Sequence, residues 1–368
     1  MTVVPTAELT IDLGALAANY RLLKSRAAPA DCGAAIKANA YGLGAERAAP
    51  TLFAAGCRHF FVAVLGEAVA LRATVPEAAI YVLSGPLGGD EGEFRAHRLI
   101  PVLNSRPQIE LWRRWCAAEG PAPAALHLDT GMSRLGLSPA ELEWFIGDAA
   151  LPGAIPLPVI LSHLACSDEP AHALNREQLT RWRAALDRLV PLLPKRPIRS
   201  FANSSGIFLG PDFHFDLARP GAALYGINPL PGASNPMRQV IGLKARILQT
   251  RHIDQGQAVG YGAHRSSRAT RLATLGLGYA DGIPRSLSHV GAAYVGGIRA
   301  PFVGRVSMDL ITIDIGDVPP HLAEPGAWVE ILGPNQSADD LGAAAGTIGY
   351  EILTSLGRRY QRTYLAAE

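Results

Sequence analysis

The sequence has only four cysteines, and they lie far apart. Cys32, Cys57, Cys116 and Cys166 form no CxxC pair, and no pair of histidines stands near them at the spacing of a zinc site. This pattern argues against a disulfide scaffold and against the common structural zinc centres. We therefore expect free thiols, a cytoplasmic protein and no metal site.

Long apolar runs and blocks of charge are also missing. No apolar run reaches the roughly 18 residues that a membrane-spanning helix needs, and the first residues, MTVVPTAELTIDLG, do not resemble an export signal. Only 18% of the residues are charged, the net charge is +2, and the 34 lysines and arginines are scattered along the chain. Neither a membrane nor a nucleic acid is therefore an expected partner.

The chain does have the length and the apolar content for two domains. Its 368 residues are 48% hydrophobic, which allows one large core and a second, smaller one. Between residues 33 and 226, short apolar runs alternate with helix-like stretches, as in parallel sheets with helical crossovers. The expected strands are 33–37, 59–64, 80–83, 100–104, 125–130, 159–163, 198–203 and a run around 215–225. Eight such units predict an α/β fold, a (β/α)8 TIM barrel, with an open doubly wound sheet as the alternative.

The composition of the chain changes after Pro229. Glycine-rich, β-branched segments such as LKARILQTRHI and AWVEILG predict short antiparallel strands, and a helix is expected over 349–360. We therefore predict a barrel over residues 10–230 and a mostly β C-terminal domain over 231–368. The first residues, 1–9, are expected to lend a strand to this second domain.

Polar residues collect at the carboxyl ends of the expected barrel strands: Lys37, Asp129, His163, Asn203 and Arg219. In a barrel, the loops at these ends converge on one mouth, where catalytic sites are built. A single polar residue at a strand end often does no more than reach solvent, but five at comparable positions favour an active site. Lys37 either ends a strand at the surface or is a desolvated amine nucleophile over the mouth. The residues alone leave both interpretations open.

Nine segments, in order along nearly the whole chain, resemble the alanine racemases. They are AIKANAYGLGA, HLDTGMSRLG, SHLACSDE, FANSSG, FDLARPGAALYG, VGYGAHR, LGLGYADGIPR, GRVSMDL and GYEILTSLGRRY. The resemblance implies a barrel followed by a β-domain, bound pyridoxal phosphate, alanine as the substrate, and a homodimer whose two active sites share residues between subunits.

The resemblance also assigns residues to the cofactor. Lys37 would carry pyridoxal phosphate as a Schiff base, and Arg219 would lie against its pyridine nitrogen, where many pyridoxal enzymes place a carboxylate. An always-charged guanidinium disfavours protonation of that nitrogen, which suppresses transamination. The residues implied at the phosphate are Tyr41, Ser204, Gly221 and Tyr350, with Ser205 as an equal alternative to its neighbour.

Racemisation needs an acid and a base on opposite faces of the α-carbon. The resemblance implies Lys37 for one face and Tyr261 of the partner subunit for the other. A phenol with a pKa near 10 is a poor base at neutral pH, and His163 with Arg219 could stabilise its ionised form. For the substrate, the resemblance implies Arg134 and the backbone N–H of the partner's Met308 at the carboxylate, Asp309 as an orienting group, and Tyr279 at the entry to the site.

One position departs from the family pattern. Many members have a carbamylated lysine two residues before the aspartate of the DTG motif, where it holds the arginine equivalent to Arg134, but this chain has His127. Histidine cannot carry that carbamate in the same way. Arg134 is therefore expected to be positioned by a bound anion or by a neighbouring side chain, and the alternative is that His127 is only a strand residue.

Three other functions share part of this pattern. A barrel-type amino-acid decarboxylase would share the lysine and the phosphate site, but such enzymes typically place a carboxylate at the ring nitrogen and lack a tyrosine at position 261. A racemase of serine or of a broader set of amino acids remains an alternative. A small pyridoxal-binding homeostasis protein would be a lone barrel, which the segments after Pro229 argue against. The sequence does not separate supply of D-alanine from its breakdown.

Overall fold

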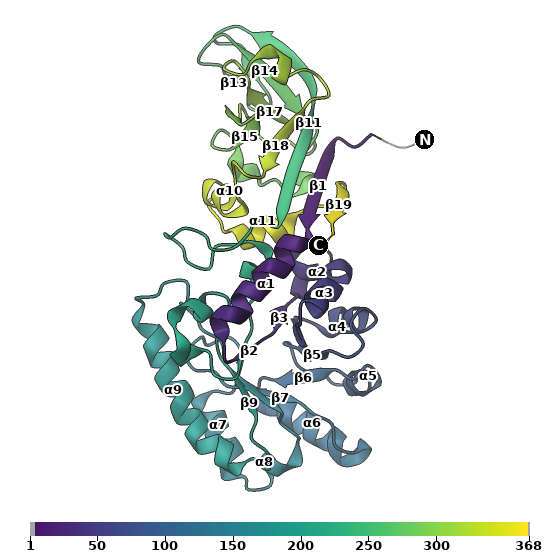
Figure 1. Cartoon of the computed structure of the whole chain (residues 1–368), viewed down its shortest axis with the longest axis vertical. Helices are drawn as coiled ribbons and strands as arrows, with labels where there is room; N and C mark the ends of the chain where they lie inside the picture. Colours follow the sequence, from purple (N-terminus) through teal and green to yellow (C-terminus); the bar gives the residue numbers. More distant parts are fainter. Residues whose placement is uncertain (1–3, 367–368) are drawn as a thin grey trace.

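The computed structural model describes residues 4–366, which form two parts stacked along the long axis of the molecule (Figure 1). In the lower part, seven parallel strands follow one another in chain order in a single sheet. They are β3 (Ala34–Ala35), β4 (His59–Val62), β5 (Ala79–Val82), β6 (Ile100–Leu103), β7 (Ala125–His127), β8 (Val159–Leu161) and β9 (Ile198–Ser200).

Alternate residues of these strands belong to two separate cores. Phe61, Tyr81 and Val102 pack with other inward-facing side chains inside the curled sheet. Their neighbours Phe60 and Ile80 belong to the larger core under the helices. Because successive strand residues point to opposite faces, strands that are covered on both faces are apolar at nearly every position.

A short eighth strand, β10 (Leu217–Ala218), lies between the ends of this sheet. It pairs in parallel with β2 (Asp31–Cys32), which only Gly33 separates from β3. On its other side, the backbone N–H of Arg219 donates to Ala202 O at 2.8 Å, just beyond β9. The predicted TIM-like α/β barrel is confirmed. The last expected strand is much shorter than 215–225, because residues Ala222–Tyr225 form a 3-10 helix instead.

Helices cover the outside of the barrel (Figure 1). The longest are α1, α6 and α9, and each buries an apolar stripe, for example through Trp112 and Trp182. The helices of this part are α1 (Leu13–Ala27), α3 (Ala45–Ala54), α4 (Leu65–Arg72), α5 (Glu91–Ala96), α6 (Arg106–Glu119), α7 (Pro139–Gly147), α8 (Leu151–Ala154) and α9 (Ala173–Leu189). Among the described residues, no helix is both long enough and apolar enough to cross a bilayer.

The upper part is built around one long strand, β11 (Ile241–Ile253). A register shift between Ile247 and Gln249 bends it, so that its first half pairs with β1 (Ala7–Asp12) and β18 (Trp328–Leu332) and its second half with β14 (Thr270–Leu275). The remaining strands are β12 (Ala258–Val259), β13 (His264–Arg265), β15 (Ala292–Val295), β16 (Ile298–Pro301), β17 (Ile311–Asp314) and β19 (Gln361–Leu365).

The N-terminal strand lies inside the upper sheet. β1 pairs antiparallel with β11 and parallel with β19, and alternate residues of β1, including Leu9 and Ile11, are buried. Two helices, α10 (Ala338–Ala345) and α11 (Gly349–Ser355), follow β18 in the chain and lie between this sheet and the barrel (Figure 1). The helix expected over 349–360 ends at Ser355, and the chain enters β19 at Gln361.

Candidate active site

Lys37 begins a left-handed turn, labelled α2 (Lys37–Tyr41), at the barrel mouth. Ala38, Asn39, Ala40 and Tyr41 all have φ between 51° and 56°. This backbone conformation costs an L-residue about 1–2 kcal/mol, and residues other than glycine rarely adopt it several times in succession. The expected strand 33–37 therefore stops at Ala35, and the glycine-punctuated loop that the sequence indicated is a tight left-handed coil.

Side chains outside the turn hold it in this strained form. The carboxylate of Glu67 accepts from the backbone N–H of Ala38 at 2.6 Å and from that of Ala63 at 2.9 Å. Within the segment, Asn39 Oδ1 accepts from Ala45 N at 2.8 Å and so ties the turn to the start of α3. The strain is therefore offset by fixed hydrogen bonds, and the direction of the Lys37 side chain is fixed with the turn.

Replacing Ala38 with glycine should stabilise the protein, because Ala38 is exposed and has a positive φ. Relief of the left-handed strain exceeds the added entropy of the unfolded chain, which leaves a gain of about 0.5–1 kcal/mol. The matched control is Ala70→Gly, at an exposed position in the right-handed helix α4. That change should cost about 1 kcal/mol. Thermal unfolding midpoints that move in the same direction for both variants would contradict this account.

Four residues, Tyr41, Ser204, Gly221 and Tyr350, form a close-packed cradle beside the turn. A Cβ built on Gly221 would come within 2.4 Å of the Tyr41 hydroxyl, so only glycine fits there. Ser204 Oγ accepts from Gly221 N at 2.9 Å and from Ala223 N at 3.3 Å, and the ring of Tyr350 lies 6.3 Å from that of Tyr41. The structure thus brings together all four residues predicted at the phosphate. Ser204 Oγ contacts this backbone, and Ser204 and Ser205 are both buried.

Arg219 is fully enclosed at the barrel mouth. Its guanidinium donates to Ser200 Oγ at 2.6 Å and to Ser162 O at 2.5 Å, and its Nη2 lies 3.5 Å from His163 Nδ1. Burial lowers the pKa of Arg219 to about 10, so the guanidinium remains charged at neutral pH. Burial and the charge of Arg219 hold the pKa of His163 well below its usual range. Because a guanidinium only donates, the neutral imidazole presents Nδ1 as an acceptor and carries its proton on Nε2.

Positive charge dominates the mouth. Burial and the nearby charge of Arg134 lower the pKa of Lys37, and Glu67 partly opposes this effect. Lys37, Arg134 and Arg219 each depress the pKa of His163, which places these cations around one space. A site with this balance attracts anions. A phosphate dianion in the cradle and a carboxylate near Arg134 both fit it.

His127 is a neutral acceptor beside the loop that carries Arg134. Burial, then Arg219 and Arg134, lower the pKa of His127 to about 3. Asn104 Nδ2 donates to Leu83 O and to Val102 O, both at 2.9 Å, so Asn104 Oδ1 accepts from His127 Nδ1 at 2.8 Å. The unprotonated nitrogen is then Nε2. The ring edge next to it packs against Gly136, where a built Cβ would lie 3.1 Å from His127 Cδ2.

The loop from Asp129 to Leu137 is fixed at both ends. Asp129 Oδ1 accepts from the backbone N–H groups of Gly131, Met132 and Ser133 at 2.9–3.1 Å. Leu137 N donates to His127 O at 2.8 Å and closes the loop. Arg134 therefore lies in a turn that these hydrogen bonds hold in place and whose Gly136 packs against the neutral His127 ring.

Racemisation by this protein should be insensitive to bicarbonate, because a neutral imidazole replaces the carbamylated lysine of many relatives. The initial rate in buffer freed of carbon dioxide is expected to match the rate after bicarbonate is added. Marked activation by bicarbonate would contradict the neutral-histidine account, since it would require a carbamate or a bound carbonate beside Arg134.

The remaining predicted residues belong to the upper part, with Tyr261 just before β13 and Met308 just before β17, and Figure 1 shows β13 and β17 away from α2, which begins at Lys37. Tyr261 stands in the turn between β12 and β13 with 72% of its surface exposed, and Met308 is 53% exposed. Tyr279 and Asp309 are exposed as well. One chain therefore assembles the cofactor cradle, but it does not bring Tyr261 or Met308 to that cradle.

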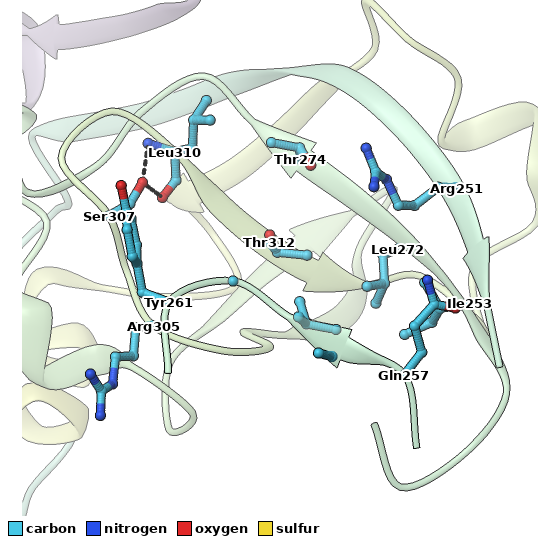
Figure 2. A pocket seen from close by; sticks show the side chains of 13 residues that line it. Arg251, Ile253, Gln257, Tyr261, Leu272, Thr274, Arg305, Ser307, Leu310 and Thr312 are labelled. Atoms are coloured by element: carbon cyan, nitrogen blue, oxygen red, sulfur yellow. Dashed lines mark hydrogen bonds between the residues drawn. The ribbon is translucent and has the colours of Figure 1, made fainter. Parts of the chain in front are cut away.

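A hollow of about 480 Å³ adjoins Tyr261. Figure 2 shows Tyr261 with Ser307 and Leu310 at one side of this hollow, and Arg251 and Ile253 at the other. The described residues of the whole chain contain no group of three or more His, Cys, Asp and Glu side chains placed to hold a metal ion.

Two models of known families match the chain. The N-terminal domain of alanine racemase matches residues 11–229, and the C-terminal domain of alanine racemase matches residues 240–364. The chain belongs to the alanine racemase family. An alanine racemase of Rhodospirillum rubrum is 51% identical over 363 residues, 98% of this chain and 96% of the relative. A catabolic alanine racemase of Mesorhizobium japonicum is 50% identical, with 98% and 93% covered.

A solved alanine racemase has the same fold. The structure of the Bartonella henselae enzyme with covalently bound pyridoxal phosphate superposes with a TM-score of 0.93, at 44% identity, and covers 98% of this chain and 100% of that one. The alanine racemase family depends on pyridoxal phosphate. The cradle of Tyr41, Ser204 and Gly221 beside Lys37, in a mouth rich in positive charge, fits that cofactor.

Several residues of the site had not been predicted from the sequence. Ser162 and Ser200 hold Arg219, Asn104 fixes the tautomer of His127, and Glu67 holds the turn of Lys37. Each acts on a residue more than 15 positions away in the sequence, as Glu67 and Ala38, 29 positions apart, illustrate. The one available signal was position, because Ser162, Ser200 and Asn104 lie at or just after strand ends.

Proposed function

We propose that this chain interconverts L- and D-alanine with pyridoxal phosphate, by a two-base mechanism, in a homodimer whose active sites are shared between subunits. Membership of the alanine racemase family supports the reaction. The proposal that the active site is shared rests on one observation. Within one chain Lys37 lies in the barrel mouth, whereas Tyr261 and Met308 are exposed on the other domain.

Residues of one chain would hold the cofactor. Lys37 would attach it, and the hydroxyls of Tyr41, Tyr350 and Ser204 would donate to the phosphate without a metal, beside Gly221, whose N–H donates to Ser204 Oγ at 2.9 Å. When bound, pyridoxal phosphate withdraws electrons from the substrate α-carbon and makes its proton acidic. Arg219, buried and charged, would disfavour protonation of the pyridine nitrogen.

Two groups move the α-proton, one on each face. Burial and Arg134 lower the pKa of Lys37, so its amine becomes neutral and basic more readily than a free lysine. Tyr261 of the partner subunit works on the opposite face. His163 carries its proton on Nε2, which can donate to the oxygen of that tyrosine, and Arg219 fixes this tautomer through Nδ1. A hydrogen-bonded chain of this kind stabilises a phenolate.

The substrate carboxylate binds to Arg134 and to the backbone N–H of the partner's Met308. Tyr279 of the partner subunit narrows the entry, which favours a small side chain such as that of alanine over a broader range of amino acids. Arg219, in place of a carboxylate at the ring nitrogen, disfavours the decarboxylase alternative.

Exposed apolar residues support the dimer. Tyr261, Met308 and Leu310 are each more than 40% exposed on the upper part, and Leu135 is 44% exposed next to Arg134 on the barrel. Large apolar side chains gathered at predicted active-site surfaces are typical of interfaces. All four cysteines are free, as is usual in reducing compartments, which supports a cytoplasmic enzyme.

Incubation with L-alanine in deuterated water tests the function. After supplementation with pyridoxal phosphate, both L- and D-alanine should accumulate deuterium at the α-carbon. Serine and other amino acids, treated in the same way, define the substrate range. Carbon dioxide release from basic amino acids, or no D-alanine from fully loaded protein, would overturn the proposal.

A further inference from the structure

Arg359 joins two aspartates that belong to different turns of the upper part. Its Nε and Nη2 donate to the two carboxylate oxygens of Asp281, both at 2.7 Å. Its Nη1 donates to Asp309 Oδ1, also at 2.7 Å. A guanidinium holds its donors in a rigid plane, so it can bind one carboxylate in a fork and a second one at a fixed angle. Lysine, with a single ammonium on a flexible stem, cannot reproduce this geometry.

The two turns that Arg359 joins are already in contact. Tyr279 N donates to Ser307 O and Ala280 N to Met308 O, both at 3.0 Å. A Cβ on Gly278 would lie within 2.4 Å of Ser307 O and Met308 O, so the backbones approach as closely as they can. Any movement of one turn therefore displaces the other.

Asp281 forms the inner end of this connection and Asp309 its outer end. Asp281 is buried, accepts from Gly278 N at 2.9 Å, and offers its backbone oxygen to Gly357 N and to the Tyr360 hydroxyl. Asp309 is exposed, and it follows Met308 directly. The outer link from Arg359 to Asp309 adds a side-chain restraint on the side of the turn on which Met308 lies, beside the backbone bond from Ala280 N to Met308 O.

We propose that Arg359 is a positioning residue: by joining Asp281 to Asp309 it holds the backbone N–H of Met308 in the orientation that the substrate carboxylate needs. The inference rests on the proposed function, in which that N–H enters the partner's site. Arg359 and Asp309 themselves touch neither substrate nor cofactor. Their effect is on substrate binding and not on proton transfer.

The sharpest variant is Asp309→Asn, which cuts the outer link and leaves the buried pair of Arg359 and Asp281 intact. The KM for both alanine enantiomers should rise at least about fivefold, while kcat changes by less than about twofold. Hydrogen–deuterium exchange in residues 305–311 should become faster. Arg359→Lys should have the same effect, because an ammonium paired with Asp281 cannot also reach Asp309.

The same domain offers a matched control. Arg268 also joins a largely buried aspartate, Asp314, to an exposed one, Asp317, at 3.1 and 3.0 Å. Arg268 and Arg359 have side-chain exposures of 50% and 52%. Asp317→Asn should leave KM, kcat and the exchange of residues 305–311 unchanged, since Asp317 lies outside the two turns.

The two measurements separate the possible failures. Unchanged exchange in Asp309→Asn would overturn the claim that Arg359 holds the turn. Faster exchange with an unchanged KM would overturn the link to substrate binding. If the wild-type enzyme failed to racemise alanine, the proposed function would be lost, while the exchange data would still decide whether Arg359 orders these residues.

Discussion

Lys37→Ala is expected to abolish both racemisation and covalent attachment of pyridoxal phosphate. Lys37 supplies an amine in the cationic mouth, and burial lowers its pKa, so we expect it to serve both as the point of attachment and as one of the two bases. Loss of a positioned base alone reduces rates by about 10²–10⁴-fold, and loss of attachment adds to this. Activity should fall by at least about 10³-fold.

The spectrum provides the direct measurement. The wild-type protein should absorb near ~420 nm and should retain the cofactor after borohydride reduction and denaturation. Lys37→Ala should lose both properties, while Lys195→Ala, at an exposed position away from the mouth, should keep them. Borohydride-fixed cofactor in Lys37→Ala would show that another lysine carries it.

Tyr261→Phe is expected to stop proton transfer on one face of the substrate α-carbon and to leave it intact on the other. The change removes one hydroxyl and keeps the ring, so attachment of the cofactor at Lys37 should be unaffected. Racemisation should fall by about 10²–10⁴-fold in both directions, because each direction uses both bases. Exchange of the α-hydrogen with solvent, with retained configuration, should persist for the enantiomer whose proton faces Lys37 and should be lost for the other.

The control for this variant is Tyr294→Phe, at a half-buried tyrosine of β15 in the same domain. It should leave racemisation and exchange at wild-type levels. Equal loss of exchange from both enantiomers in Tyr261→Phe would contradict the assignment of Tyr261 to a single face.

The sequence predicted the elements that regular geometry determines. Lys37 and His163 follow strands of the seven-stranded parallel sheet and Arg219 follows β10, which lies between its ends, so their convergence at the mouth followed from the fold class. Residues 1–9 were expected to lend a strand to the second domain, and β1 pairs with β11 there, with Leu9 and Ile11 buried. The resemblance to alanine racemases supplied the pairing of these residues with a cofactor.

The unpredicted features depend on tertiary contacts. ANAY carries no signature of a left-handed turn, because alanine favours right-handed helix and the bond from Ala38 N to the distant Glu67 helps to offset the strain. The tautomer of His127 depends on Asn104, 23 residues earlier. Arg359 and Asp281 are 78 residues apart. Specific contacts of this kind across loops leave no periodic pattern in a single sequence.

Complementation between two inactive variants tests the shared active site most directly. Lys37→Ala and Tyr261→Phe chains, carrying different tags, would be co-expressed, and the mixed dimers would be isolated and assayed with L-alanine. In such a dimer, one site combines an intact Lys37 with an intact Tyr261 from the other chain. The account predicts about half of the wild-type activity per mixed dimer, and neither parent dimer should be active. Mixed dimers as inactive as their parents would show that each chain must supply both bases to its own site, and would contradict the central claim.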